Sequence, residues 1–91
     1  MPYIKPEEKA KFDENSLYGA GLKCEHPGDL NYAISEIIAG YIASKGKRYQ
    51  HMNDVLGALH AAGLEFNRRI VAPYEDTKIQ ENGDTSYKRI E

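Results

Sequence analysis

The sequence has few of the cysteines that form disulfide bonds or bind metals in small proteins. Among its 91 residues there is one cysteine, Cys24, and no tryptophan. A single cysteine excludes a disulfide within the chain, and a lone thiol is more often a small apolar filler than a nucleophile. His51 and His60 would lie about half a turn out of phase on one helix, and His26 has no Cys or His at ligand spacing. We therefore expect no disulfide, no metal and no cofactor.

The chain also lacks a strong charge of either sign and a long apolar run. Twelve basic and fourteen acidic residues give a formal net charge of −2, so no global field attracts nucleic acid or an anionic membrane. The longest stretch of low charge, residues 30–44, is too short and too polar to span a bilayer, and no apolar run follows a basic N-terminus. We expect a cytoplasmic protein without a membrane span.

The longest amphipathic pattern runs from residue 51 to residue 72. At about 100° per residue, eight apolar residues fall on one stripe, as expected of a helix packed on a core. They are Met52, Val55, Leu56, Leu59, Ala62, Gly63, Phe66 and Ile70. A second, weaker strip consists of Gly57, Ala61, Leu64 and Val71. A helix with two apolar strips usually has two partners, so the second strip is predicted to meet another subunit.

Other elements follow from their boundary residues. Asp29 is a good N-cap for a helix over residues 30–45, and Gly46 would end it. The short link after Gly46 makes this helix and the next antiparallel neighbours in a hairpin. Pro73 should kink or break the central helix, which then continues to a stop at Asn82 and Gly83.

The N-terminal part is less regular. Pro6 suits the first position of a short helix, with Glu7 and Glu8 in its first turn. Residues 13–26 contain two glycines and read as a loop or a broken helix. The predicted fold is thus all-α: an antiparallel helical hairpin with a Pro-kinked C-terminal helix and a short N-terminal helix. Residues 1–83 form a single helical domain, and residues 84–91 form a loosely held tail.

One group of polar residues could bind a ligand. Asn53, His60 and Asn67 form a line at heptad spacing between the two apolar strips of the central helix. Arg68 lies close to this line, and its planar donor fork suits a carboxylate or a phosphate. Lys47 and Arg48 are in the turn before the same helix, whose N-terminus favours anions. These six residues are the candidate site; a polar seam between helices and an ordinary solvated turn are the simpler interpretations.

Catalysis finds no positive support in the sequence. Paired acids, as in small all-α nucleotide pyrophosphatases that bind magnesium, would have to be Glu7 with Glu8 or Glu75 with Asp76. Both pairs fall in first turns of predicted helices, where the helix dipole alone favours them. No serine or cysteine stands in a recognisable nucleophile motif, and there is no phosphate-binding glycine loop. No catalytic residue is predicted.

Four blocks of the chain resemble one known family. They are MPYIKPE, PGDLNYAIS, YQHMNDVLGAL and LEFNRRIVAPYEDTKIQENGD, and the resemblance covers residues 1–12 and 27–84. The last block is the most specific because it fixes an arginine pair, Pro73 and a Gly83-Asp84 ending at set distances. The chain is similar in these blocks to short proteins of tailed phages and bacteria that have no established activity. The resemblance implies a small helical protein.

These observations favour a non-enzymatic, oligomeric binding protein of phage or bacterial origin. We expect it to act in conflict between phage and host as a counter-defence factor, either by binding a host protein or by sequestering a small anionic ligand such as a nucleotide. This role rests on the resemblance. Two alternatives stay open: a small all-α nucleotide hydrolase, which would show magnesium-dependent turnover, and a nucleic-acid accessory factor, which would show salt-dependent DNA binding.

Overall fold

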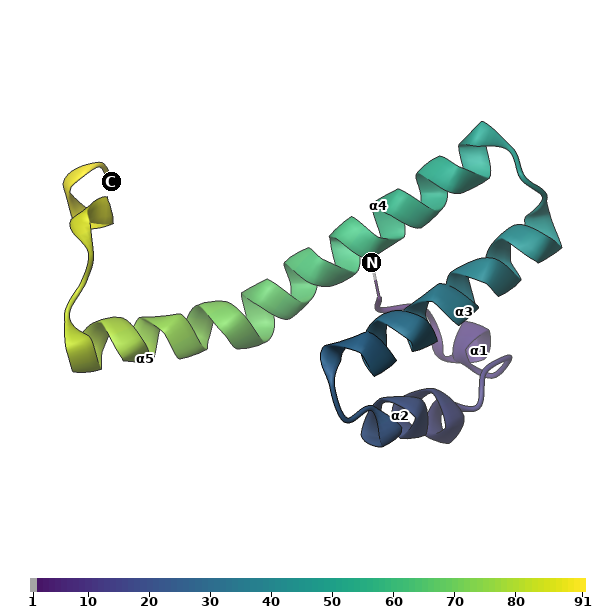
Figure 1. Cartoon of the computed structure of the whole chain (residues 1–91), viewed down its shortest axis with the longest axis horizontal. Helices are drawn as coiled ribbons and strands as arrows, with labels where there is room; N and C mark the ends of the chain where they lie inside the picture. Colours follow the sequence, from purple (N-terminus) through teal and green to yellow (C-terminus); the bar gives the residue numbers. More distant parts are fainter. Residues whose placement is uncertain (1) are drawn as a thin grey trace. The chain divides into compact units, whose positions relative to one another are not determined.

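The computed structural model describes residues 2–91, with the backbone alone at Glu14, and this part of the chain is helical without any strand (Figure 1). The predicted all-α class is therefore confirmed. Helical segments follow one another with short connections: α1 (Pro6–Lys9), α2 (Glu14–Lys23), α3 (Pro27–Lys45), α4 (Tyr49–Phe66), the π turn η1 (Asn67–Val71), α5 (Ala72–Asn82) and the 3-10 helix η2 (Ser86–Arg89). No helix among the described residues is long and apolar enough to cross a membrane.

The region expected to be a loop or a broken helix folds as the ten-residue helix α2, so that prediction was wrong. The carboxylate of Asp13 caps the helix, because it accepts hydrogen bonds from the Asn15 backbone amide at 3.1 Å and from the Ser16 hydroxyl at 2.8 Å. The same bonds, that of the Ser16 hydroxyl first, hold the pKa of Asp13 below its ordinary value. A cap of this kind satisfies first-turn amides and offsets the helix-weakening effect of Gly19 and Gly21.

Helix α3 begins earlier than its sequence suggested. Pro27 occupies the first turn, where its missing N–H costs nothing, and the N-cap is His26, which makes no side-chain capping bond. Asp29, the expected cap, instead accepts the backbone amide of Glu25 at 3.0 Å and closes the turn between α2 and α3. The helix ends at Gly46, whose φ of 103° is accessible to glycine without strain. That end was predicted.

A short connection over residues 46–48 separates α3 from α4. The Arg48 amide donates to the Gly46 carbonyl at 3.0 Å, and the His51 amide donates to the Arg48 carbonyl at 3.1 Å, so the turn leads directly into the first turn of α4. The Tyr41 hydroxyl of α3 donates to Asp54 of α4 at 3.4 Å. These contacts are those of two consecutive helices joined by a tight turn, as the hairpin prediction required.

Pro73 does not interrupt the helix but follows a π turn. The chain stays helical from α4 through η1 into α5, and the Ala72 amide donates to the carbonyl of Asn67, five residues back. A proline at position 73 cannot donate to the Arg69 carbonyl, and its ring would clash there in a regular α-helix. The wider π turn accommodates both effects, and the ribbon changes direction at this point (Figure 1). The predicted kink therefore takes the form of a π turn.

The chain divides into two compact units, Met1–Ala58 and Leu59–Glu91. In the first unit Ile34, Ile38 and Ile42 of α3 are half-buried, at a spacing of four residues that puts them on one face. The second unit is the helix that runs from residue 59 to residue 82, followed by the C-terminal segment with η2. The end of α5 at Gly83, with a φ of 86°, was predicted.

None of the described residues is fully buried. On the predicted core stripe of the central helix Val55 is half-buried, whereas Leu56 is 66% exposed and Phe66 is 60% exposed. The stripe was expected to pack on a core, and within this single chain most of it does not. The apolar surface that the sequence assigned to packing is therefore left open.

Candidate functional site

Three of the predicted ligand residues belong to the first unit. Lys47 and Arg48 lie in the connection between α3 and α4, and Asn53 lies on the second turn of α4. All three are exposed, and none of their side chains bonds to another described residue. Their basic and amide groups are therefore accessible to an external ligand. The same exposure is expected of residues in an ordinary solvated turn.

The other three, His60, Asn67 and Arg68, belong to the second unit and are also exposed. Asn67 opens the π turn, where its carbonyl accepts the Ala72 amide. Arg68 forms a two-pronged pair with Glu65: Nε and Nη2 each donate to a different carboxylate oxygen at 2.7 Å. The two residues are three apart on the helix, a spacing at which side chains meet, and their pair shows the planar guanidinium of Arg68 binding a carboxylate.

The predicted subunit contact strip is accessible in part. Leu64 is 57% exposed and Gly57 is exposed, whereas Ala61 and Val71 are half-buried. Gly57 belongs to the first unit and the other three residues to the second. In the second unit the strip thus offers one large open side chain, Leu64, between two smaller contacts.

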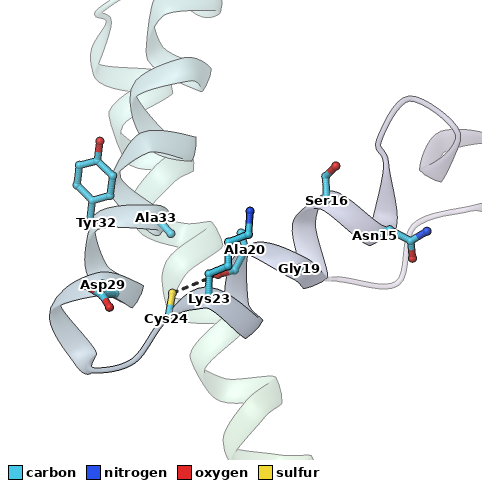
Figure 2. A pocket seen from close by; sticks show the side chains of 9 residues that line it. All are labelled: Asn15, Ser16, Gly19, Ala20, Lys23, Cys24, Asp29, Tyr32 and Ala33. Atoms are coloured by element: carbon cyan, nitrogen blue, oxygen red, sulfur yellow. Dashed lines mark hydrogen bonds between the residues drawn. The ribbon is translucent and has the colours of Figure 1, made fainter.

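A groove between α2 and α3 was not anticipated from the sequence. Its volume is about 720 Å³, within the range of small-molecule sites. Small residues of both helices, Gly19, Ala20 and Ala33, leave the space open (Figure 2). Its polar groups come from Asn15, Ser16, Lys23, Cys24, Asp29 and Tyr32, so a basic and an acidic side chain both line it. The signal that could have indicated it is the run of small residues in the segment expected to be a loop or a broken helix.

Cys24 lines this groove. The thiol of Cys24 donates to the Ala20 carbonyl at 3.4 Å, drawn as a dashed line in Figure 2. His26 is the nearest histidine in the sequence, and its Nδ1 lies 3.5 Å from the Asp29 carboxylate. Cys24 is therefore bonded to backbone and His26 faces an acid, an arrangement that differs from the thiol and base pair of a nucleophilic site.

A second polar cluster, also missed by the sequence reasoning, centres on Asp54. One oxygen of its carboxylate accepts from Gln50 at 2.9 Å, and the other accepts from Tyr41 at 3.4 Å. His51 Nδ1 is enclosed 3.9 Å from the same carboxylate without a hydrogen bond. Partial burial, then the negative charge of Asp54, raises the pKa of Tyr41. The Tyr41 bond connects α3 to α4, whereas the contacts of Gln50 and His51 with Asp54 lie within α4.

Within residues 2–91 there is no group of three or more His, Cys, Asp or Glu side chains that could hold a metal ion. No curated protein and no solved structure matches the chain. One family model does match it, and it covers residues 1–85. The chain therefore belongs to the family described as "Domain of unknown function (DUF6899)".

Proposed function

We propose that the protein is a non-enzymatic binding protein that acts as an oligomer of its own chain. The observation that carries the proposal is that no described residue is fully buried, although large apolar side chains are numerous. A folded chain of this length normally removes about 60% of its unfolded surface from water. Exposed apolar patches on this scale mark contacts with other proteins. The strip of Gly57, Ala61, Leu64 and Val71 is one such contact surface.

The ligand side of the proposal concerns an anion. The six residues Lys47, Arg48, Asn53, His60, Asn67 and Arg68 are all exposed, and the pair between Arg68 and Glu65 illustrates how a carboxylate or phosphate would be held. We place the origin of the protein in a phage or a bacterium, on the strength of the resemblance. Its task would be to bind a host protein or to sequester a small anionic ligand, such as a nucleotide, in the cytoplasm of the host.

The first test is the mass of the protein in solution. Light scattering at micromolar concentration is expected to give a multiple of the 10.3 kDa of one chain. A mass of one chain, with the helical circular dichroism signal intact, would refute the oligomer.

The second test addresses the ligand. Thermal shift and calorimetry with mononucleotides, dinucleotides and cyclic nucleotides should find one that stabilises the wild type and fails to stabilise Arg68→Ala. Arg89→Ala, in the exposed C-terminal segment, is the matched control and should respond as the wild type does. If no nucleotide shifts the wild type, nucleotide sequestration is refuted and a protein partner becomes the better explanation.

A further inference from the structure

His51 has an enclosed nitrogen that no other described group satisfies. The residue lies in the first turn of α4, and its side chain is 23% exposed. Its Nδ1 atom is buried without a hydrogen bond, 3.9 Å from Oδ2 of Asp54, which is too far for one. An enclosed polar atom without a partner lowers stability. The arrangement therefore favours any change that gives Nδ1 a hydrogen bond.

The carboxylate that faces this nitrogen is already held in place. Oδ1 of Asp54 accepts from the Gln50 amide at 2.9 Å, and Oδ2 accepts from the Tyr41 hydroxyl at 3.4 Å. A carboxylate oxygen has two lone pairs, so Oδ2 can accept a second bond from His51. Tyr41 belongs to α3, whereas Asp54 and His51 belong to α4. A bond from His51 would thus steady the group to which α3 is attached.

A proton on the imidazole of His51 would supply that bond. If the neutral ring carries its proton on Nε2, a lone pair of Nδ1 faces the Asp54 carboxylate and is repelled by it. If the proton is on Nδ1, a neutral donor faces the carboxylate. A second proton turns the ring into a charged donor in both cases, and hydrogen bonds between ionised groups are shorter and roughly twice as strong as neutral ones. Protonation therefore draws the two side chains together.

Other charges near the start of α4 act against this proton or leave it unaffected. The free amides of a first turn disfavour a positive charge, and α4 has no acidic residue in its first turn. Partial burial, then the charge of Asp54, raises the pKa of Tyr41 above 10.0, so Tyr41 is neutral near pH 7. The basic side chains that precede His51 on α3 and in the connection are all exposed: Lys45, Lys47 and Arg48.

The carboxylate of Asp54 outweighs these opposing charges. Water and salt weaken the field of exposed charges, whereas Asp54 lies 3.9 Å from an enclosed nitrogen. Histidine is also the side chain whose charge ordinarily changes between about pH 5 and pH 8, a range in which aspartate stays ionised. The pair can therefore switch between a neutral and a charged contact near physiological pH.

We infer that His51 makes the link between α3 and α4 responsive to pH: when protonated it pairs with Asp54 and strengthens the link, and when neutral it leaves Asp54 to Gln50 and Tyr41. Because the folded chain then binds this proton more tightly than the unfolded chain, the added stability is present at acidic pH and is lost as the pH rises. The connection over residues 46–48, which carries Lys47 and Arg48, should be more ordered at acidic pH. The inference does not depend on the proposed oligomer or its ligand.

The test is amide hydrogen exchange of the full chain at about pH 5.5 and about pH 8, expressed as protection factors so that the intrinsic pH dependence cancels. In the wild type, residues 46–54 are expected to be several-fold better protected at the lower pH. His51→Gln, which stays neutral, and Asp54→Asn, which removes the negative charge, should each abolish this difference. The double variant should lose no more than either single variant, because both changes remove the same contact.

The other two histidines of the chain provide matched controls. His26→Gln removes a ring 3.5 Å from Asp29, and His60→Gln removes an exposed ring of α4; both variants should retain the pH response of residues 46–54. A second measurement uses the wild type alone, in case a variant does not fold. By NMR of the protein with labelled histidine, the Nδ1 proton of His51 should exchange slowly with water at about pH 5.5, and that of His60 rapidly.

Three results would each overturn the inference. They are equal protection of residues 46–54 at both pH values in the wild type, a pH response that persists in His51→Gln or Asp54→Asn, and a His51 proton that exchanges as fast as that of His60. The proposed function is tested by the mass in solution and by nucleotide binding, so each of these results would leave it standing.

Discussion

The hydroxyl of Tyr41 donates to Asp54 across 3.4 Å and so joins α3 to α4 within the first unit. The same carboxylate accepts from Gln50 on its other oxygen, which fixes its orientation toward α3. Because no described residue is fully buried, such polar contacts between consecutive helices carry more of the local order than they would above an enclosed core.

Tyr41→Phe should remove part of the stability loss that the wild type shows as the pH becomes alkaline. The folded pKa of Tyr41 is raised above its ordinary value of 10.0, first by partial burial and then by the charge of Asp54. Its neutral form therefore stabilises the fold below pH 10, and that contribution is lost as the pH rises through the folded pKa. Thermal melts from pH 8 to 11 should show the wild type falling more steeply than Tyr41→Phe. Tyr87→Phe, in the exposed C-terminal segment, is the control; equal slopes for all three proteins would contradict the prediction.

Asp13→Ala should loosen α2. The carboxylate accepts from the Asn15 amide and the Ser16 hydroxyl, and its removal leaves first-turn groups without partners. Hydrogen exchange of residues 14–23 is expected to accelerate several-fold, and Asp13→Asn, which still accepts a bond, should retain most of the protection. The pKa of Asp13 is lowered from 3.8, so the cap is complete above that pH and is lost as the pH falls through the lowered value. Unchanged exchange in the alanine variant would show that the cap is dispensable.

Helix ends were predictable where one residue decides them. Gly46 and Gly83 have positive φ, a region that other residues avoid, and both ends were expected from the sequence. The start of α2 was missed because two glycines inside the segment lower its helix propensity. The stabilising effect of the cap depends on how the Asp13 side chain is oriented, which the sequence does not show. A prediction from helix propensity counts the cost of the glycines but not the hydrogen bonds of the cap.

Contacts near the candidate site were predictable only between residues that are close in the sequence. The pair of Arg68 with Glu65 follows from a spacing of three residues on a helix. The groove between α2 and α3 could be inferred only by recognising that residues 13–26 are helical, and the glycines of that segment weaken a helix prediction. The π turn was not predicted for a different reason. Pro73 would clash with the preceding turn of a regular α-helix, but the sequence does not show whether the helix avoids the clash by a break or by one wider turn.

Pro73→Ala should convert the π turn to regular α-helix. An alanine at this position restores the amide that can donate to the Arg69 carbonyl and removes the ring that clashes with it, an effect of about 3 kcal/mol in helix interiors. A crystal structure of the variant, or hydrogen-bond couplings measured by NMR, should find bonds four residues apart throughout residues 67–73. Pro27→Ala, at the first turn of α3, is the control and should leave the π turn in place. A π turn that survives Pro73→Ala would show that packing, and not the proline, produces it.

Leu64→Glu should weaken the assembly through the strip that contains Gly57, Ala61 and Val71. Leu64 is 57% exposed in the single chain, and burial of a leucine contributes about 1.5–3 kcal/mol. A charge at its place should lower the mass found by light scattering while the helical signal by circular dichroism stays largely intact. Asn53→Glu places the same charge on an exposed polar position of α4 and serves as the control. If Leu64→Glu assembles as the wild type does, this strip is not a subunit contact.

Glu65→Gln should strengthen anion binding at Arg68. In the structure Nε and Nη2 of Arg68 each donate at 2.7 Å to Glu65, whose side chain is only 19% exposed, while the Arg68 side chain is 70% exposed. An external carboxylate or phosphate must therefore compete with an internal one for the same donor fork. A neutral amide binds a guanidinium less strongly than a carboxylate does, since hydrogen bonds between ionised groups are roughly twice as strong as neutral ones. Calorimetry should give a several-fold tighter Kd for the anion that binds the wild type, and no binding for Arg68→Ala. Lys78→Gln, which removes a pair with Glu81 on α5, controls for a general change of charge. A weaker Kd for Glu65→Gln at unchanged oligomer mass would mean that Glu65 orients Arg68 for the ligand instead of competing with it.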